Sequence, residues 1–150
     1  MMTNTESWDA AASVELVQRC YGHIEQGQWE QANALLAENF TFNEPPSLDY
    51  GGQWHGRDAM QRLFTFLMSY WSEPDIKVNH MIGDDKYCIV LMTFSAKGKK
   101  TGERFSQDVV EVLHIADGRI TDLYVHYFDT AQLALDTGSI ARLTKASEQA

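Results

Sequence analysis

The sequence is poor in the residues that mark unfolded or repetitive chains. Its 150 residues include only 3 prolines and 10 glycines, while 44% are hydrophobic and 11% aromatic. Collagen-like and low-complexity chains need far more proline and glycine, and disordered chains carry far fewer apolar residues. We therefore expect residues 1–150 to form a single domain, because a chain of this length is too short to form two hydrophobic cores of sufficient size.

Basic residues are also scarce. Lysine and arginine total 12 against 21 aspartates and glutamates, which gives a formal net charge of −9. Nucleic acids and anionic membranes repel such a surface unless a local basic patch overrides it. The densest basic stretch, Lys97 with Lys99 and Lys100, resembles an exposed hairpin tip. We expect neither nucleic acid nor membrane as a partner.

Cysteine is rare and long hydrophobic runs are missing. Cys20 and Cys88 lie far apart, and neither belongs to a Cys-x-x-Cys pair; this argues against redox and metal motifs and favours a reduced, cytoplasmic compartment. No histidine pair has the i, i+4 spacing of a helical zinc site, so we expect no bound metal. The apolar runs are shorter than the roughly 18 residues of a membrane span. The start, MMTNTESWDAAAS, lacks the pattern of an export signal.

Apolar residues recur with helical spacing through most of the first half of the chain. A first helix should begin after Ser7 or Asp9 and stop at Gly27. The remaining elements expected here are a short helix near 29–36, an extended piece at 40–44 before Pro45, a polar loop at 47–56, and a helix from about 60 that stops before Pro74.

From Asp75 onward the spacing changes to the period of two that is typical of strands. Strands are expected near 75–82, 86–96, 103–116 and 119–128. Asp117-Gly118 gives the strongest hairpin signal, because both turn positions need positive φ. Asp129 should cap a last helix, Thr130 to Asp136, that closes at Gly138 before a polar tail beyond Lys145. The fold class is therefore α+β.

Four segments in order, VQRC, LLAENFTFNEP, HGRDAMQRLF and DGRITDLYVHYFD, resemble the superfamily of SnoaL-like polyketide cyclases, nuclear transport factor two-like proteins, ketosteroid isomerases and limonene epoxide hydrolases. The resemblance covers a core of about residues 7–138. It implies a cystatin-like, cone-shaped α+β barrel in which the N-terminal helices pack on the concave face of a curved antiparallel sheet. It also implies a pocket for a small hydrophobic molecule and a homodimer.

The resemblance to ketosteroid isomerases is incomplete. Glu44 falls where that family has its general base, which faces a tyrosine and a protonated aspartate. Cys20 stands in place of the tyrosine, with Tyr21 next to it, and Val110 stands in place of the aspartate, with Asp108 two residues earlier. Authentic steroid isomerisation is therefore not expected.

The epoxide hydrolases of this superfamily use an Asp-Arg-Asp set to activate water. His126, Met92 and Phe94 occupy those three places, so the resemblance argues against this activity.

Strand alternation suggests which side chains share the concave face. We expect Glu44, Asp108 and His126 to converge there as catalytic groups. A carboxylate in an apolar cavity has a raised pKa, and a nearby histidine exchanges protons near neutral pH. Such a set could move a proton next to a carbonyl without a metal or organic cofactor. The expected substrate-binding residues are Tyr21, Phe42, Trp54, Phe64, Phe94, Tyr124 and Phe128.

Structural roles are the alternatives. Glu44 could be a solvated carboxylate, His126 a hydrogen-bonded core histidine, and Asp108 a partner of Arg104 or Lys97. Many of the aromatic residues could be ordinary core. The chain is therefore either a cofactor-free cyclase or isomerase of a carbonyl compound, or a non-catalytic module that binds a hydrophobic ligand.

Two further points concern the surface of the protein. We expect the dimer to form through an outer sheet face that carries Val109, Glu111 and Leu113. Whether the loop Ser47–Gly56 acts as a lid stays open.

Overall fold

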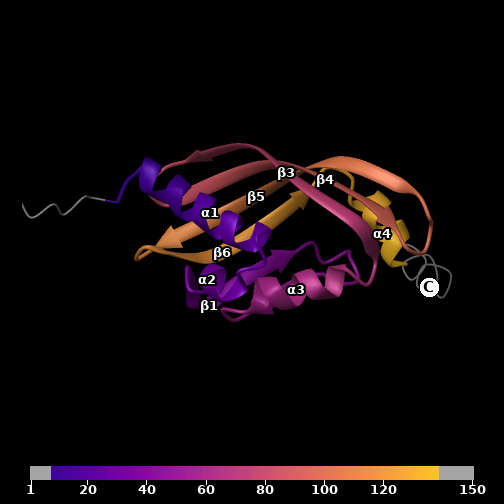
Figure 1. The fold of residues 1–150 in the computed structure, drawn as a ribbon, viewed down its shortest axis with the longest axis horizontal. Helices are drawn as coiled ribbons and strands as arrows, with labels where there is room; N and C mark the ends of the chain where they lie inside the picture. Colours follow the sequence, from indigo (N-terminus) through magenta and orange to yellow (C-terminus); the bar gives the residue numbers. More distant parts are fainter. Residues whose placement is uncertain (1–7, 139–150) are drawn as a thin grey trace, which may run out of the picture.

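The fold combines helices with one curved sheet that does not close into a full barrel. The computed structural model describes residues 8–138. Within them the elements are α1 (Ala10–Glu25), α2 (Trp29–Asn33), β1 (Leu36–Glu44), β2 (Gly52–His55), α3 (Ala59–Leu67), β3 (Trp71–Gly83), β4 (Tyr87–Gly98), β5 (Arg104–Ala116), β6 (Arg119–Tyr127) and α4 (Thr130–Thr137). The expected α+β cone is confirmed (Figure 1).

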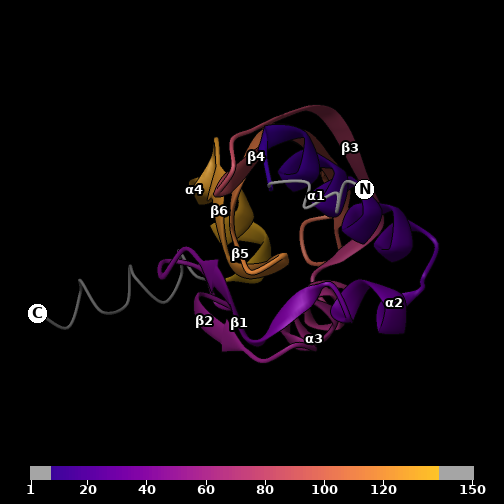
Figure 2. The ribbon, with the colours of Figure 1, turned by 90° about the vertical axis from the view of Figure 1, so that its left-hand side faces the viewer.

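The six strands form one sheet in the order β2-β1-β6-β5-β4-β3. Strands β3 to β6 make the expected antiparallel meander, but β1 pairs with β6 in parallel. The sheet is therefore mixed rather than purely antiparallel. Figure 2 shows it curling from β1 and β2 round to β3, with α1 on the open side of the curl.

Strand β2 lies in the segment expected to be a polar loop. Its four residues pair antiparallel with β1, so that Trp54 lies opposite Phe42. The sequence gives only a weak strand signal here, because the strand has just four residues and begins directly after a glycine-rich stretch. Helix α3 lies beside these two strands (Figure 1).

The two ends of α1 show why it forms and where it lies. Asp9 caps the helix by accepting a hydrogen bond from the Ala12 amide at 3.0 Å. Leu16, Val17 and Cys20 bury one face of the helix. Near its start the helix packs against the end of β3. This packing is close: a Cβ added to Gly83 would lie 2.9 Å from a Val14 methyl carbon. Helix α1 thus covers this end of the concave face.

Two local expectations are confirmed by the backbone. Asp117 and Gly118 both have positive φ, 52° and 71°, as the tight turn between β5 and β6 requires. Asp129 caps α4 by accepting from the Gln132 amide at 3.1 Å, and Gly138 ends that helix with φ of 81°. The polar tail expected beyond Lys145 lies outside the described residues.

Helix α4 is tied to the sheet by the buried side chain of Asp136, which is 3% exposed. Its carboxylate accepts from the Trp71 indole at 2.9 Å, from Thr101 at 2.8 Å and from Gln132 at 3.1 Å. An added Cβ at Gly98 would lie 2.3 Å from the same carboxylate, so only glycine fits there. These contacts fix α4 across the turn between β4 and β5.

The inward-facing side chains of β5 and β6 are the opposite set from the one expected. The buried residues of β5 are Gln107, Val109, Glu111, Leu113 and Ile115. Both faces of this strand carry valines, so the alternation alone fits two orientations. The odd-numbered series has the larger apolar content and faces the helices, which reverses the expected assignment. No helix among residues 8–138 is long and apolar enough to span a membrane.

Candidate functional site

Glu44, the last residue of β1, points into the core. It is only 4% exposed, and both carboxylate oxygens accept from the Tyr127 hydroxyl, at 3.1 and 3.0 Å. Burial raises the pKa of Glu44 well above its usual value, and the Tyr127 hydrogen bond lowers it only in part. The solvated alternative for Glu44 is therefore wrong.

A second carboxyl group faces the same interior from β5. Glu111 is 9% exposed, and its Oε1 accepts a 2.5 Å hydrogen bond from the Tyr21 hydroxyl on α1. Burial raises the pKa of Glu111 to about 7, although the Tyr21 hydrogen bond opposes the shift. A carboxyl group with such a pKa can both give and take protons near neutral pH.

The two carboxyl groups interact with each other. Negative charge on Glu111 further raises the pKa of Glu44. Two like charges in a poorly solvated interior disfavour double ionisation, so the pair tends to hold one proton between them. This is the electrostatic arrangement that acid/base chemistry uses, with one group ionised and the other protonated.

Tyr50 adds a third tyrosine to this interior. It is 2% exposed, and its hydroxyl lies beside that of Tyr127. Two turns shape this segment: the Leu48 amide donates to the Pro45 carbonyl, and the Gly51 amide donates to the Leu48 carbonyl in the turn that contains Tyr50. The first part of the segment considered as a lid is thus packed into the core.

The expected catalytic residues do not converge. Glu44 faces the interior, whereas Asp108 and His126 are exposed on the convex side of the sheet. The reason is the reversed orientation of β5 and β6. The sequence interpretation missed Glu111 and Tyr127, which a consistent odd-numbered inward series on both strands would have placed beside Glu44.

Some of the expected substrate-binding residues face the interior, and others are exposed. Phe42 and Phe94 are buried, and Tyr21 is half-buried at Glu111. The half-buried Trp54 and Phe64 pack on Phe66 and Trp29, respectively. Tyr124 and Phe128 are 51% and 85% exposed, so the expectation that they line the concave face is wrong.

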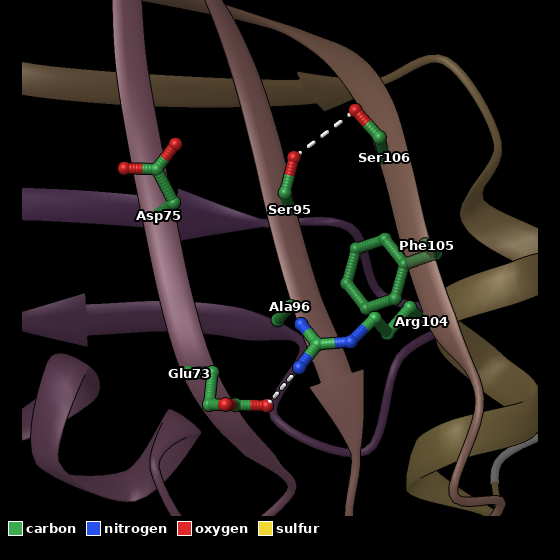
Figure 3. Close-up of a pocket in the computed structure, with 7 residues that line it drawn as sticks. All are labelled: Glu73, Asp75, Ser95, Ala96, Arg104, Phe105 and Ser106. Atoms are coloured by element: carbon green, nitrogen blue, oxygen red, sulfur yellow. Dashed lines mark hydrogen bonds and ion pairs between the residues drawn. The ribbon is translucent and has the colours of Figure 1, made fainter.

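Two hollows lie along the first residues of β5. The first, about 390 Å³, is bounded by β3, β4 and β5. Figure 3 shows Arg104 reaching to Glu73, with which it forms an exposed 2.5 Å ion pair, beside a Ser95–Ser106 hydrogen bond of 3.0 Å. The second, about 380 Å³, adjoins it and extends to α4. Neither hollow is lined by Glu44 or Glu111.

The concave side of the sheet is uncovered along the middle of β3. Ile76 lies opposite Phe94, and Val78 lies opposite Met92, so each pair points to one face. Ile76 and Val78 are nevertheless 47% and 39% exposed, although their partners are buried. Ile76 and Val78 are thus exposed apolar side chains on the same face as the buried Phe94 and Met92.

No group of three or more histidine, cysteine, aspartate or glutamate side chains is placed to hold a metal ion among residues 8–138.

Comparison with known proteins agrees with this fold. An NTF2-like protein of unknown function from Burkholderia pseudomallei is 19% identical, with a TM-score of 0.74 over 84% of this chain and 97% of its own. A proposed SnoaL-like polyketide cyclase from Jannaschia is 11% identical, with a TM-score of 0.70 over 89% and 96%. TerC, crystallised with polyporic acid, is 14% identical, with a TM-score of 0.71 over 83% and 98%.

Among curated proteins, none matches the chain significantly. The family model of the SnoaL-like domain matches residues 17–123, which is most of the chain and includes both buried carboxyl groups. The chain therefore belongs to the SnoaL-like family.

Proposed function

We propose that this protein is a cofactor-free acid/base enzyme that acts on a small apolar carbonyl compound. The observation that carries the proposal is the pair of buried carboxyl groups, Glu44 and Glu111, each bound to a tyrosine hydroxyl within one interior. Retaining two such groups in a core costs stability, and functional sites are where such costs are commonly found.

Glu44 is the proposed base. When the proton that the pair shares lies on Glu111, Glu44 is ionised and removes a proton from the carbon next to the substrate carbonyl, and the electron pair of that C–H bond forms the enolate. Tyr127 holds the Glu44 carboxylate in place through its two hydrogen bonds. Proton return to a different carbon gives isomerisation, and attack of the enolate carbon on a second carbonyl gives cyclisation.

Glu111 is the proposed second proton carrier. Its pKa of about 7 lets it donate a proton at neutral pH to the oxygen or carbon that becomes basic. The structural likeness to a proposed polyketide cyclase and to TerC supports the proposal only through the shared fold, because both proteins are less than 25% identical to this chain.

Deuterium exchange tests the first chemical step without knowledge of the natural substrate. 2-Tetralone is an apolar ketone with acidic C–H bonds, and its exchange in D₂O can be followed by proton NMR. We expect the protein to accelerate exchange over buffer and Glu44→Gln to lose roughly 10²–10⁴-fold of that acceleration. Gln preserves the size of the side chain and an acceptor for Tyr127.

The matched control is the double variant Asp108→Asn with His126→Ala. Both positions are exposed on the convex side, so the exchange rate should stay at the wild-type level. Wild-type acceleration that survives in Glu44→Gln would contradict the assignment of the base.

The second candidate function is non-catalytic binding of a hydrophobic molecule. It is favoured by the position of both hollows away from the carboxyl groups. Saturable binding of 2-tetralone without any acceleration of exchange would support this function over catalysis.

A further inference from the structure

The two buried carboxyl groups accept hydrogen bonds of different geometry from their tyrosines. Glu111 accepts one short bond, 2.5 Å, from the Tyr21 hydroxyl to its Oε1. Glu44 accepts from Tyr127 at 3.1 and 3.0 Å, so a single hydroxyl proton is divided between two carboxylate oxygens. A hydroxyl bonds an ionised carboxylate more strongly when the contact is short. The hydrogen bonds therefore favour the ionised form more at Glu111 than at Glu44.

Burial acts in the same direction. Glu44 is 4% exposed and Glu111 is 9% exposed, and loss of water disfavours the ionised form of a carboxyl group. At both residues burial is the largest cause of the raised pKa, and the tyrosine hydrogen bond opposes it. Glu111, with the shorter hydrogen bond and slightly more water, is the member of the pair that ionises more readily.

The titratable groups that interact with this pair or with Tyr21 are neutral. Burial raises the pKa of each, so its thiol or hydroxyl keeps its proton at pH 7. None of them supplies a charge that could replace the hydrogen bond from Tyr21. They are Cys20 on α1, Cys88 on β4, Tyr50 and Tyr127.

We propose that Tyr21 is a positioning residue that holds Glu111 in its ionised form and so keeps the shared proton of the pair on Glu44. Glu44 becomes ionised when this proton moves to Glu111: one O–H bond breaks, the other forms, and the total charge of the pair is unchanged. Tyr21 thereby sets the fraction of the protein in which Glu44 can act as a base. That consequence rests on the proposed function, whereas the position of the proton does not.

Carbon-13 NMR of protein labelled at the glutamate δ-carbons locates the proton. Glu44→Gln and Glu111→Gln assign the two signals, because each variant removes one of them. Between the two titration steps of the pair, the wild-type protein should show Glu44 mainly protonated and Glu111 mainly ionised. Tyr21→Phe keeps the ring and removes the donor, so the ratio of protonated Glu111 to protonated Glu44 should rise about tenfold or more. An unchanged ratio would overturn the proposal.

Two further variants distinguish a specific hydrogen bond from a general loosening of the core. Tyr127→Phe removes the donor of Glu44, so it should move the ratio the opposite way, further toward protonated Glu44. Tyr87→Phe makes the same substitution at a residue that is 45% exposed, and the ratio should stay at its wild-type value. A shift in the same direction in Tyr21→Phe and Tyr127→Phe would contradict the role of Tyr21.

Exchange of 2-tetralone in D₂O separates this proposal from the proposed function. At pH 7, Tyr21→Phe should exchange about three- to tenfold faster than the wild type, since more of the protein carries an ionised Glu44. A shifted ratio without any catalysed exchange supports the role of Tyr21 and contradicts the enzyme. Catalysed exchange with an unchanged ratio overturns the role of Tyr21 and leaves the enzyme in place. Slower exchange despite a raised ratio would support the position of the proton and make Glu111 the base.

Discussion

The Tyr21 hydroxyl and the Glu111 carboxylate lie 2.5 Å apart, although 90 positions separate them in the sequence. The contact joins the main helix of the concave side to the centre of the sheet. A hydrogen bond from tyrosine favours the ionised carboxylate, yet the pKa of Glu111 is still raised to about 7, because burial has the larger effect. The protonation of Glu111 therefore makes the free energy of unfolding depend on pH.

We expect the protein to lose stability as pH rises from about 4.5 to about 7. In this window the folded state keeps the proton on Glu111 and the unfolded state releases it, so unfolding becomes more favourable with pH. The shift from 4.5 to about 7 corresponds to about 3 kcal/mol in the free energy of unfolding. Urea unfolding at a series of pH values measures it.

Glu111→Gln is the corresponding variant. It cannot titrate, so the decline between pH 4.5 and 7 should become shallower, and the part that remains should come from Glu44, whose pKa is also raised. Equal slopes for the variant and the wild type would show that Glu111 is not the linked group.

The sequence predicts local features of this fold well. The Asp117-Gly118 turn and the Asp129 cap depend on short-range backbone geometry, which a few residues determine. The face of a strand that turns inward depends instead on packing against distant helices. Because β5 carries Val110 and Val112 on one face and Val109 on the other, its alternation alone could not show which face turns inward.

The contrast between local signals and long-range packing also explains which site residues could be predicted. Glu44 was recognisable from its place at the end of β1 in a family-like segment. Glu111 was predicted on the outer surface, because the alternation of β5 was interpreted with Asp108 and Val110 facing inward. Tyr50 gave no signal, since its buried position arises from the two turns after Pro45.

A pair of glycine substitutions should have opposite effects on stability. Gly51→Ala places a Cβ 2.2 Å from the Pro45 carbonyl oxygen and 2.8 Å from that of Leu48, so we expect a loss of about 2 kcal/mol or more. Gly22→Ala, in α1, meets nothing within 4 Å and should gain about 0.5–1 kcal/mol from helix propensity. Chemical denaturation of both variants tests this. A neutral Gly51→Ala would contradict the close packing beneath Tyr50.

The convex side of the sheet carries an apolar patch that we expect to join two copies of the chain. Its members are cross-strand neighbours on β4, β5 and β6: Ile89 lies opposite Val112, Leu91 opposite Val110, and Val112 also opposite Tyr124. Val109, Glu111 and Leu113, the residues expected to form this surface from the sequence, are buried beneath the helices and cannot contribute.

Sedimentation velocity at micromolar concentration should therefore give the mass of a dimer. A symmetric interface places the same patch on both copies, so one substitution adds two charges to it. Leu91→Lys with Val112→Lys should shift the protein to monomer, because two desolvated ammonium groups per chain would have no partners. Glu103→Lys, at the exposed turn before β5, changes charge outside the patch and should remain dimeric. A wild-type protein that sediments as a monomer would refute the dimer, and a dimer that persists in the double lysine variant would place its interface elsewhere.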